Sequence, residues 1–402
     1  VIVIDESGSM SAESNITKND YNGYRHDAAA SLLSLCDAKQ SRVALIPFSD
    51  PEKVAYLNEI ALGNELHHVT IENNNRKRSE LISLLINDNN KTGKCETLYE
   101  FSQQYGGQTD IGTALDQAVE LLVNDKSGNT PVIVLLTDGD FCINKPGTSD
   151  VDTNAVQLSK DKYVAAYNKA ADNDIKVFTV ALAKNEAGLA SLKDRHFLED
   201  AARATNAIYQ GITSASDLPE VFNSFFAHLV GSEVVSLKGV TSYDAQAGEY
   251  TATFTVPNQS IAEANILIPV GKSQYAALYK PGSNETVAYD NNKYLKFSTS
   301  YFTLLKILNP REVGEWRVVY SNPSKKELED ITVNVIFSYD VVPEISFSNN
   351  PLPKTAETKV MVKFKNPDGK YTTDTSLYNG DIQAYLKVYD SNDAPILELD
   401  KP

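Results

Sequence analysis

The stretch VIVIDESGSM at residues 1–10 decides the fold class of this chain. Residues 1–4 form a continuous apolar run, which is typical of a strand buried on both faces of a parallel sheet. The run ends in the carboxylate of Asp5, and hydroxyl groups follow two and four residues later at Ser7 and Ser9. A buried strand that delivers polar side chains at its C-terminal end predicts a binding site at that edge of the sheet.

Short apolar runs and helical periods alternate up to about residue 232. The apolar runs predict strands at residues 43–48, 53–57, 132–136, 176–182 and 207–209. Apolar residues at helical spacing predict helices at residues 24–38, 78–86, 112–123, 160–171 and 218–229. Strands separated by helices indicate βαβ units, so we predict an α/β doubly wound, Rossmann-like domain with a central, mostly parallel sheet.

The pattern changes to period two after residue 233. Strands with this alternation and turn residues between them are predicted at residues 250–256, 265–270, 275–279, 301–308, 316–320 and 331–339. This series is typical of an antiparallel, all-β sandwich. Another strand, turn and strand series follows at residues 359–364 and 382–390. We therefore expect an α/β domain at 1–232, a β-sandwich domain at 233–341, and a β-strand segment at 342–402 that completes this sandwich or begins a second, Ig-like one.

The composition excludes some classes of partner. With 53 acidic and 37 basic side chains, the net charge of the 402 residues is −16. Nucleic acid and anionic lipid bind basic faces, so neither is expected as the main partner. No apolar run reaches about 18 residues, so no membrane insertion is expected within this fragment, which we expect to be part of a longer chain.

Two further segments carry side chains toward the edge where Asp5 lies. The loop GGQTDIG at residues 106–112 places Thr109 before a helix, and the apolar strand at 132–137 ends in Asp138. In a doubly wound sheet of order 3-2-1-4-5-6, strands one and four are neighbours and ligands bind beyond their carboxyl ends. We therefore predict one site that contains Asp5, Ser7, Ser9, Thr109 and Asp138.

The chemistry of these side chains indicates a metal site. Two carboxylates and three hydroxyls are hard oxygen donors, which suit Mg²⁺, with Mn²⁺ or Ca²⁺ as alternatives. Two carboxylates neutralise the ion, and an octahedral shell then has room for a carboxylate from a partner. The sequence thus predicts a divalent ion that a partner's Asp or Glu can reach.

This set resembles the metal-ion-dependent adhesion site of the von Willebrand factor type A domain, as also found in integrin inserted domains. The family motif is D-x-S-x-S, then a Thr, then an Asp, and all five predicted site residues match it. The resemblance covers roughly residues 1–232. It implies that Ser7 and Ser9 coordinate the ion directly, and that Asp5, Thr109 and Asp138 bind directly or through water.

A second resemblance lies in residues 309–316, NPREVGEW. This segment is similar to the N-P-x-x-G-x-W turn of β-sandwich domains that follow type A domains in some large extracellular proteins. We expect Trp316 to enter a strand there and to anchor the core of the sandwich.

Three acidic residues near the predicted site receive other roles. Alternation directs Glu6 away from the ligand positions, so we expect its carboxylate in solvent or bonded to the loop. Asp110 is predicted to cap the following helix, and Asp140 is predicted to be a charge at the rim of the site.

The cysteines show no metal-ligand spacing. Cys36 lies on an apolar helical stripe and is predicted to be a buried thiol. Cys95 and Cys142 lie in loops that converge on the predicted site, and both a disulfide between them and two free thiols stay open.

Catalytic motifs are missing from the sequence. No G-x-S-x-G elbow follows a strand, and His196 lies in a helical context, which disfavours a hydrolase. No P-loop motif occurs.

We therefore expect a non-enzymatic adhesion or recognition module that binds an acidic group of a protein or extracellular-matrix ligand through Mg²⁺. Its β-sandwich would serve as a stalk, and its expected location is extracellular or on a cell surface, in bacteria. The alternative is an intracellular or structural assembly factor that uses the same domain to hold a partner subunit.

Overall fold

A computed structural model describes most of the chain. The described residues are 1–10, 20, 24–36, 42–49, 69–70, 85, 107–125, 128–183, 185–192, 194–214, 217–230, 233–236, 242–268, 275–290, 293–298, 302–321, 333–339, 342–348, 359–365, 370–372, 386–389 and 395–399. The strand expected at residues 53–57 lies outside them, and so does the helix expected at 78–86 except for Leu85.

The first domain is built on a parallel sheet, as predicted. Within the described part of the chain, its strands have the order β3-β1-β5-β6-β7. Their bounds are Ile2–Asp5 for β1, Leu45–Phe48 for β3, Val132–Thr137 for β5, Lys176–Leu182 for β6 and Tyr209–Ile212 for β7. The apolar run of β1 is buried throughout, because helices cover both faces of the sheet. The α/β doubly wound fold class is therefore confirmed.

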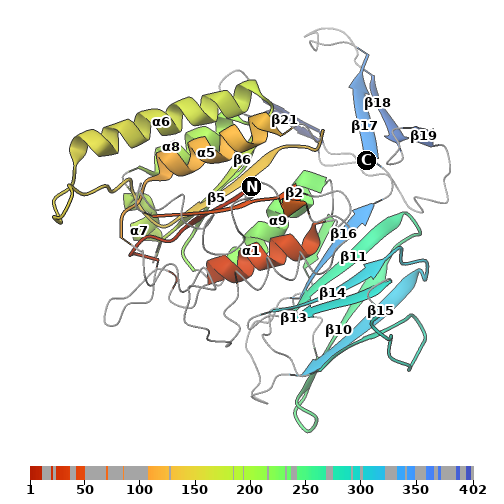
Figure 1. Cartoon of the computed structure of the whole chain (residues 1–402). Helices are drawn as coiled ribbons and strands as arrows, with labels where there is room; N and C mark the ends of the chain where they lie inside the picture. The colour runs from red at the N-terminus through yellow and green to blue at the C-terminus, as the bar shows by residue number, and fades with distance from the viewer. Residues whose placement is uncertain are drawn as a thin grey trace.

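Helices cover both faces of this sheet (Figure 1). One face packs against α5 (Ile111–Asn124), α6 (Thr153–Asp172) and α8 (Arg195–Ala204), and the other against α1 (Tyr24–Leu35) and α9 (Leu218–Val230). A short helix, α7, spans Glu186–Ser191, and the strands β2 (Arg42–Val43) and β4 (Val69–Thr70) form a small antiparallel pair. None of the helices in the described ranges is both long enough and apolar enough to cross a membrane.

The second region consists of antiparallel sheets. Among the described residues, one sheet has the order β12-β15-β10-β9 and the other has the order β13-β14-β11-β16-β8. The strands are β8 (Glu233–Ser236), β9 (Ser242–Asp244), β10 (Glu249–Val256), β11 (Ile261–Ile268), β12 (Ala276–Tyr279), β13 (Tyr294–Ser298), β14 (Thr303–Leu308), β15 (Gly314–Ser321) and β16 (Asn334–Tyr339). The strands β8, β9 and β13 were not predicted from the sequence.

Trp316 anchors the core between these sheets, as expected. Its side chain is fully buried and stacks on Phe254, with ring centroids 6.4 Å apart. Its indole N–H donates to the carbonyl oxygen of Glu312 at 2.9 Å, so the polar edge of the ring is satisfied. The turn before it uses positive φ angles at Asn309 and Gly314.

The sandwich packs directly against the first domain through α1 and α9. Leu267, Phe302, Leu304 and Ile336 of the sandwich share one apolar cluster with these two helices. Every residue from Arg25 to Leu35 of α1 is buried. The domain boundaries expected at residues 232 and 341 stay predictions.

Lys306 marks the polar part of this contact. Its ammonium group donates to the carbonyl oxygen of Leu35 at 3.3 Å and pairs with Glu263 at 2.8 Å. Leu35 is the last residue of α1, where a cation is favoured by the helix dipole.

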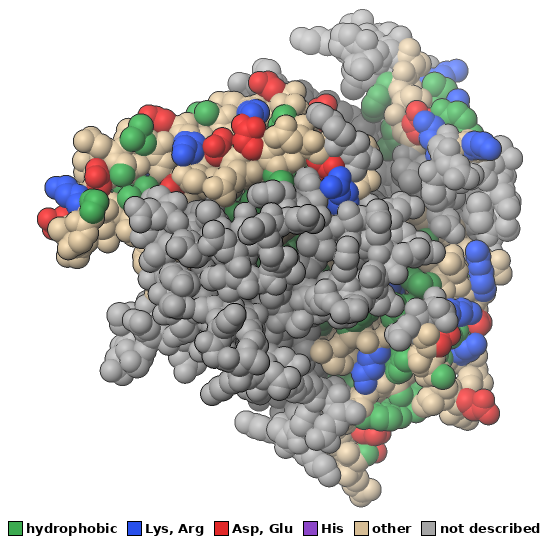
Figure 2. All heavy atoms as spheres, in the orientation of Figure 1, with side chains coloured by type: hydrophobic (Ala, Val, Ile, Leu, Met, Phe, Trp, Pro, Cys, Tyr) green, Lys and Arg blue, Asp and Glu red, His purple; other side chains and the backbone are tan. Residues whose placement is uncertain are grey.

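The last segment forms smaller sheets. The strands β17 (Val342–Phe347), β18 (Val360–Lys365) and β19 (Tyr371–Thr372) pair in antiparallel fashion, and β20 (Leu386–Tyr389) pairs with β21 (Pro395–Leu399). The strands expected at 359–364 and 382–390 correspond to β18 and β20. Apolar and basic side chains lie side by side over β17 and β18 at the upper right of Figure 2, where Ile345 is 60% exposed.

Candidate metal centre

Asp5 lies at the carboxyl end of β1 and is completely buried. Its Oδ1 accepts a hydrogen bond from the backbone N–H of Ser7 at 2.7 Å. Its Oδ2 accepts from the hydroxyl of Thr137, the last residue of β5, at 2.6 Å. These two bonds fix the carboxylate between the ends of neighbouring parallel strands.

A chain of hydroxyl groups links this loop to Asp138. The hydroxyls of Ser7 and Ser9 lie 3.0 Å apart, and Ser9 donates to Oδ1 of Asp138 at 2.8 Å. The backbone N–H of Met10 donates to the carbonyl oxygen of Ser7 at 3.0 Å, which turns the loop back on itself. The structure therefore brings Asp5, Ser7, Ser9 and Asp138 together, as the sequence predicts.

The loop that carries Thr109 lies beside this group. Thr109 is 4% exposed and forms a two-bond bridge with Cys142, with N···O distances of 2.7 and 3.1 Å. A Cβ atom placed on Gly8 would lie 3.7 Å from the Cα atom of Gly107, so the two loops are in contact. The loop that carries Thr109 thus touches the loop that carries Ser7 and Ser9.

Asp110 caps α5, as predicted. Its Oδ1 accepts hydrogen bonds from the N–H of Thr113 at 3.1 Å and from the hydroxyl of Ser159 at 2.5 Å. A Cβ on Gly112 would approach the carbonyl oxygen of Ser159 to 1.9 Å, so only glycine lets α5 and α6 pack this closely. Asp110 therefore holds the helix that follows Thr109.

Asp140 links the loop after β5 to the start of α8. One of its carboxylate oxygens accepts from the backbone N–H of Asp194 at 3.0 Å, and Asp194 pairs with Lys160 at 2.6 Å. Asp140 is half-buried, which fits the rim position predicted for it.

The electrostatics of Asp5 are unfavourable to a carboxylate. Burial, followed by the nearby negative charge of Asp138, raises the pKa of Asp5 to about 7, although hydrogen bonds from Thr137 and Ser7 act in the opposite direction. A bound cation would therefore relieve repulsion between the two carboxylates.

The expectation for Glu6 was wrong. Its side chain is completely buried and pairs with the guanidinium of Arg25 at 2.6 Å, and His26 Nε2 lies 2.6 Å from its other oxygen. Burial alone would raise the pKa of Glu6, but the charges of Arg25 and His26 outweigh it and leave this pKa below its usual value. The alternation rule gave the side of the strand correctly, but α1 covers that side.

The donor set fits a hard divalent ion. Two carboxylates and three hydroxyls offer only oxygen atoms, as Mg²⁺ prefers. In the ranges that the structure describes, no group of three or more His, Cys, Asp or Glu side chains is arranged to hold a metal. Binding at this site would therefore depend on the hydroxyls as well as on the carboxylates.

The structure describes two of the three cysteines, Cys36 and Cys142. Cys142 carries a free thiol, and Cys95 lies outside the described residues. Cys36 is half-buried against the apolar cluster of α1, with its thiol 3.3 Å from the carbonyl oxygen of Leu32.

The sequence reasoning missed two residues in and near the site, Thr137 and Arg25. Thr137 directly precedes Asp138 and orients Asp5, and a hydroxyl at the end of a buried strand was the available signal. Arg25 lies three, four and seven residues before Ala28, Ala29 and Leu32, so its position on the buried stripe of the helix could have been recognised.

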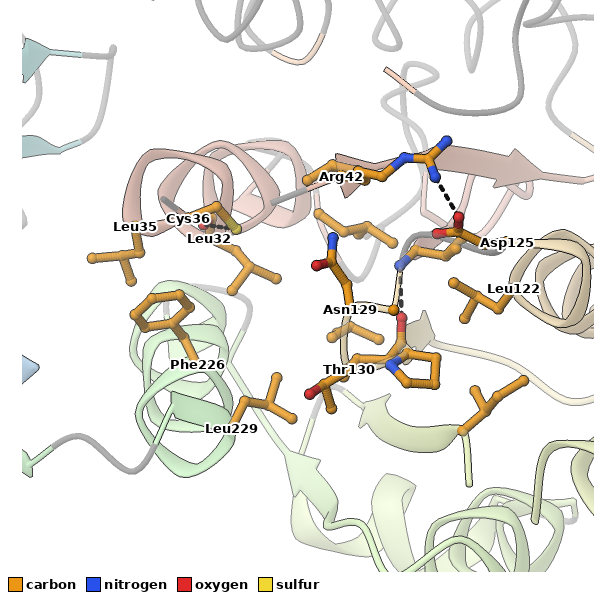
Figure 3. A pocket seen from close by; sticks show the side chains of 18 of the residues that line it. Leu32, Leu35, Cys36, Arg42, Leu122, Asp125, Asn129, Thr130, Phe226 and Leu229 are labelled. Atoms are coloured by element: carbon orange, nitrogen blue, oxygen red, sulfur yellow. Dashed lines mark hydrogen bonds and ion pairs between the residues drawn. The ribbon is translucent and has the colours of Figure 1, made fainter. Parts of the chain in front are cut away.

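A cavity of about 710 Å³ lies at the opposite, amino-terminal edge of the sheet, where Val1 precedes β1 and Val132 begins β5. Leu32 of α1 and Phe226 of α9 point into it, and Arg42 pairs with Asp125 at its side (Figure 3). The sandwich contributes Ala262, Glu263, Ser338 and Tyr339 to its lining. This cavity is separate from the predicted metal site.

Residues 1–222 match the von Willebrand factor type A domain family. This stretch is more than half of the 402 residues. No functionally curated protein matches the sequence.

Several solved structures match this chain. The pilus adhesin SpaC from Lactobacillus rhamnosus GG shares 14% identity at a TM-score of 0.38, covering 97% of this chain and 55% of SpaC. A variant of the PilB minor pilin from Streptococcus sanguinis also shares 14% identity at a TM-score of 0.38, covering 57% of this chain and 60% of PilB. The adhesive tip pilin GBS104 from Group B Streptococcus agalactiae shares 11% identity at a TM-score of 0.36, covering 91% of this chain and 81% of that one. The chain thus spans little more than half the length of SpaC and PilB.

Proposed function

Because the chain belongs to the von Willebrand factor type A domain family, we propose that its first domain binds a divalent cation, Mg²⁺ foremost, and recognises an acidic partner group through it. The observation that carries this proposal is the hydrogen-bonded series from Asp5 through Ser7 and Ser9 to Asp138. It gathers oxygen donors and two carboxylates at the carboxyl ends of neighbouring strands, where doubly wound folds bind ligands.

Asp5, Ser7, Ser9, Thr109 and Asp138 would hold the ion. The carboxylates of Asp5 and Asp138 balance its charge. The hydroxyls of Ser7 and Ser9 already lie within hydrogen-bond distance of each other, and that of Ser9 donates to Asp138. When bound, Mg²⁺ supplies a Lewis-acidic centre that prefers oxygen ligands and keeps positions for water or a partner carboxylate. The role of the protein is then recognition rather than catalysis.

The partner in this proposal is a protein or extracellular-matrix ligand with an exposed Asp or Glu. The proposed location is outside the cell, on a bacterial surface or in secreted form, as expected from the sequence. The antiparallel sandwich supports this proposal, because its turn at residues 309–316 places Trp316 in the core as the resemblance implies.

Calorimetry with Mg²⁺ and with Mn²⁺ tests the metal part of the proposal. We expect one ion per chain for the unmodified protein and no binding for Asp5→Ala, which removes one of the two charge-balancing carboxylates. Asp152→Asn is the matched control, because it removes a carboxylate that only caps α6. The proposal fails if the unmodified protein binds neither ion at millimolar concentration, or if Asp5→Ala binds as well as the unmodified protein.

A simple carboxylate tests the recognition part. With Mn²⁺ bound, acetate should lower the relaxation rate of water protons because it displaces water from the ion, and neutral acetamide should not. If acetate and acetamide act alike, an acidic group is not what the site recognises.

A further inference from the structure

A buried cluster of charged side chains lies directly beneath the candidate metal centre. It consists of Glu6, Asp20, Arg25 and His26, which we name the Arg25 network. All four side chains are at most 5% exposed. Glu6 stands between Asp5 and Ser7 in the sequence, so this network begins within the loop that supplies three of the proposed ligands.

One guanidinium contacts both ends of the loop at residues 5–10. Arg25 Nη2 donates to Glu6 Oε2 at 2.6 Å and Nε donates to Glu6 Oε1 at 3.3 Å. Nη1 donates to the carbonyl oxygen of Met10 at 3.3 Å. Ser7 and Ser9 lie between these two attachment points, so their backbone is restrained from both sides.

The same guanidinium is itself held by the start of α1. Its Nη1 pairs with Asp20 Oδ2 at 2.8 Å. The carboxylate of Asp20 also accepts from the backbone N–H groups of Tyr24 and Arg25 at 2.7 and 3.0 Å. These donors belong to the first turn of the helix, where N–H groups lack partners within the helix. Asp20 therefore fixes the guanidinium of Arg25 to the first turn of a buried helix.

Side-chain alternation explains why the network and the metal centre share one strand end. Successive side chains of an extended strand point to opposite sides, so Asp5 faces Thr137 while Glu6 faces α1. Fixing Glu6 therefore also fixes the directions of Asp5 and Ser7.

We propose that Arg25 is a positioning residue for the metal site, and that it holds Ser7 and Ser9 in their binding geometry through Glu6 and the Met10 carbonyl. This inference rests on the proposed metal binding. Arginine suits the role because its planar fork contacts several acceptors at once, whereas lysine is a single point charge. Partners that orient metal ligands without touching the ion typically change metal affinity by about 10–100-fold when they are replaced.

The test compares metal affinity with stability in the full chain. Arg25→Lys keeps the charge and loses the fork, and the pair Glu6→Gln with Arg25→Gln removes both charges together. Lys306→Met is the matched control, because it breaks the ion pair between the buried Lys306 and the partly exposed Glu263 at the other end of the same helix. For each protein, calorimetry with Mn²⁺ gives the affinity, and the melting temperature in EDTA gives the stability without metal.

We expect all three variants to melt at lower temperature than the unmodified protein. Only the Arg25 variants should bind Mn²⁺ more weakly, by about tenfold or more, while Lys306→Met keeps the original affinity. The proposal is overturned if the Arg25→Lys protein and the double variant bind as tightly as the unmodified protein, or if Lys306→Met weakens binding equally. Absence of binding to the unmodified protein would instead refute the proposed function, and this inference with it.

Discussion

The candidate metal centre and the Arg25 network hold consecutive carboxylates in opposite electrostatic surroundings. Asp5 and Glu6 are both completely buried. Burial and the charge of Asp138 raise the pKa of Asp5 to about 7. Burial acts on Glu6 in the same direction, but Arg25 and His26 overcome it and lower the pKa of Glu6.

Among the described residues, the two regions differ in whether a positively charged side chain pairs with the buried carboxylate. The Arg25 network carries its own cation and is complete without a ligand. The candidate metal centre gathers oxygen donors and a second carboxylate near Asp5, and the negative charge of Asp138 adds to the effect of burial on the pKa of Asp5. A buried carboxylate in such surroundings is stabilised by a proton or by a bound cation. The comparison therefore supports a folding role for Glu6 and the proposed ligand-binding role for Asp5.

The largest effect is expected from breaking the network outright. Arg25→Met should lower the free energy of unfolding by about 3–5 kcal/mol, because it leaves the carboxylates of Glu6 and Asp20 buried without their cation. Urea denaturation in EDTA measures this loss. A loss below about 1 kcal/mol would mean that the network contributes no more than a surface ion pair.

A substitution in the candidate metal centre should instead raise the free energy of unfolding. Asp5→Asn removes a charge that is unfavourable in the metal-free protein, so at pH 8 in EDTA the free energy of unfolding should rise. The gain should exceed about 1 kcal/mol, which is roughly the free energy of one pKa unit. Glu6→Gln is the control for the neighbouring position and should be destabilising. The comparison breaks if both variants shift stability in the same direction.

Stability and pH should be linked through Asp5 in the absence of metal. Its pKa is higher in the folded protein than its usual value, so the folded state binds the proton more tightly. The contribution of Asp5 to stability is therefore lost as pH rises toward 7.

Metal binding at pH 6 should release about one proton per ion, and this release should decline toward pH 8. Calorimetry in buffers of different ionisation enthalpy measures the release, and a value near zero at pH 6 would contradict the raised pKa.

The smallest effect on stability is expected at Ser9. Ser9→Ala removes the hydrogen bond to Asp138, and Ser9 is exposed. The free energy of unfolding, measured by thermal denaturation in EDTA, should therefore change by about 1 kcal/mol or less. The same variant should weaken Mg²⁺ binding, because it deletes one oxygen donor. Unchanged Mg²⁺ affinity would remove Ser9 from the ligand set.

The proximity of Asp5 and Asp138 could be predicted from the sequence, because the topology of the fold determines which strands are neighbours. The alternation of apolar runs and helices indicates a doubly wound sheet, and the order 3-2-1-4-5-6 assumed for it places the carboxyl ends of β1 and β5 side by side, as observed. The cap at Asp110 was equally accessible, because it depends only on a short local motif.

The partners of Glu6 and Lys306 could not be predicted in the same way. Alternation states which side of a strand a residue faces, but not which helix or domain covers that side. Glu6 is covered by α1, and Lys306 reaches the end of that helix only because the sandwich packs on the first domain. Such contacts depend on how whole layers dock. The strand β17 was missed for a local reason, since Pro343 weakens a strand pattern.

The most direct test of the account is a crystal structure of the protein grown or soaked with Mn²⁺, with anomalous scattering used to locate the ion. We predict one strong anomalous peak per chain at the carboxyl end of β1, within coordination distance of the Ser7 and Ser9 hydroxyls and beside Asp5, Thr109 and Asp138. A well-ordered site without a peak there, or a peak only elsewhere in the chain, would contradict the assignment of these residues to a metal centre.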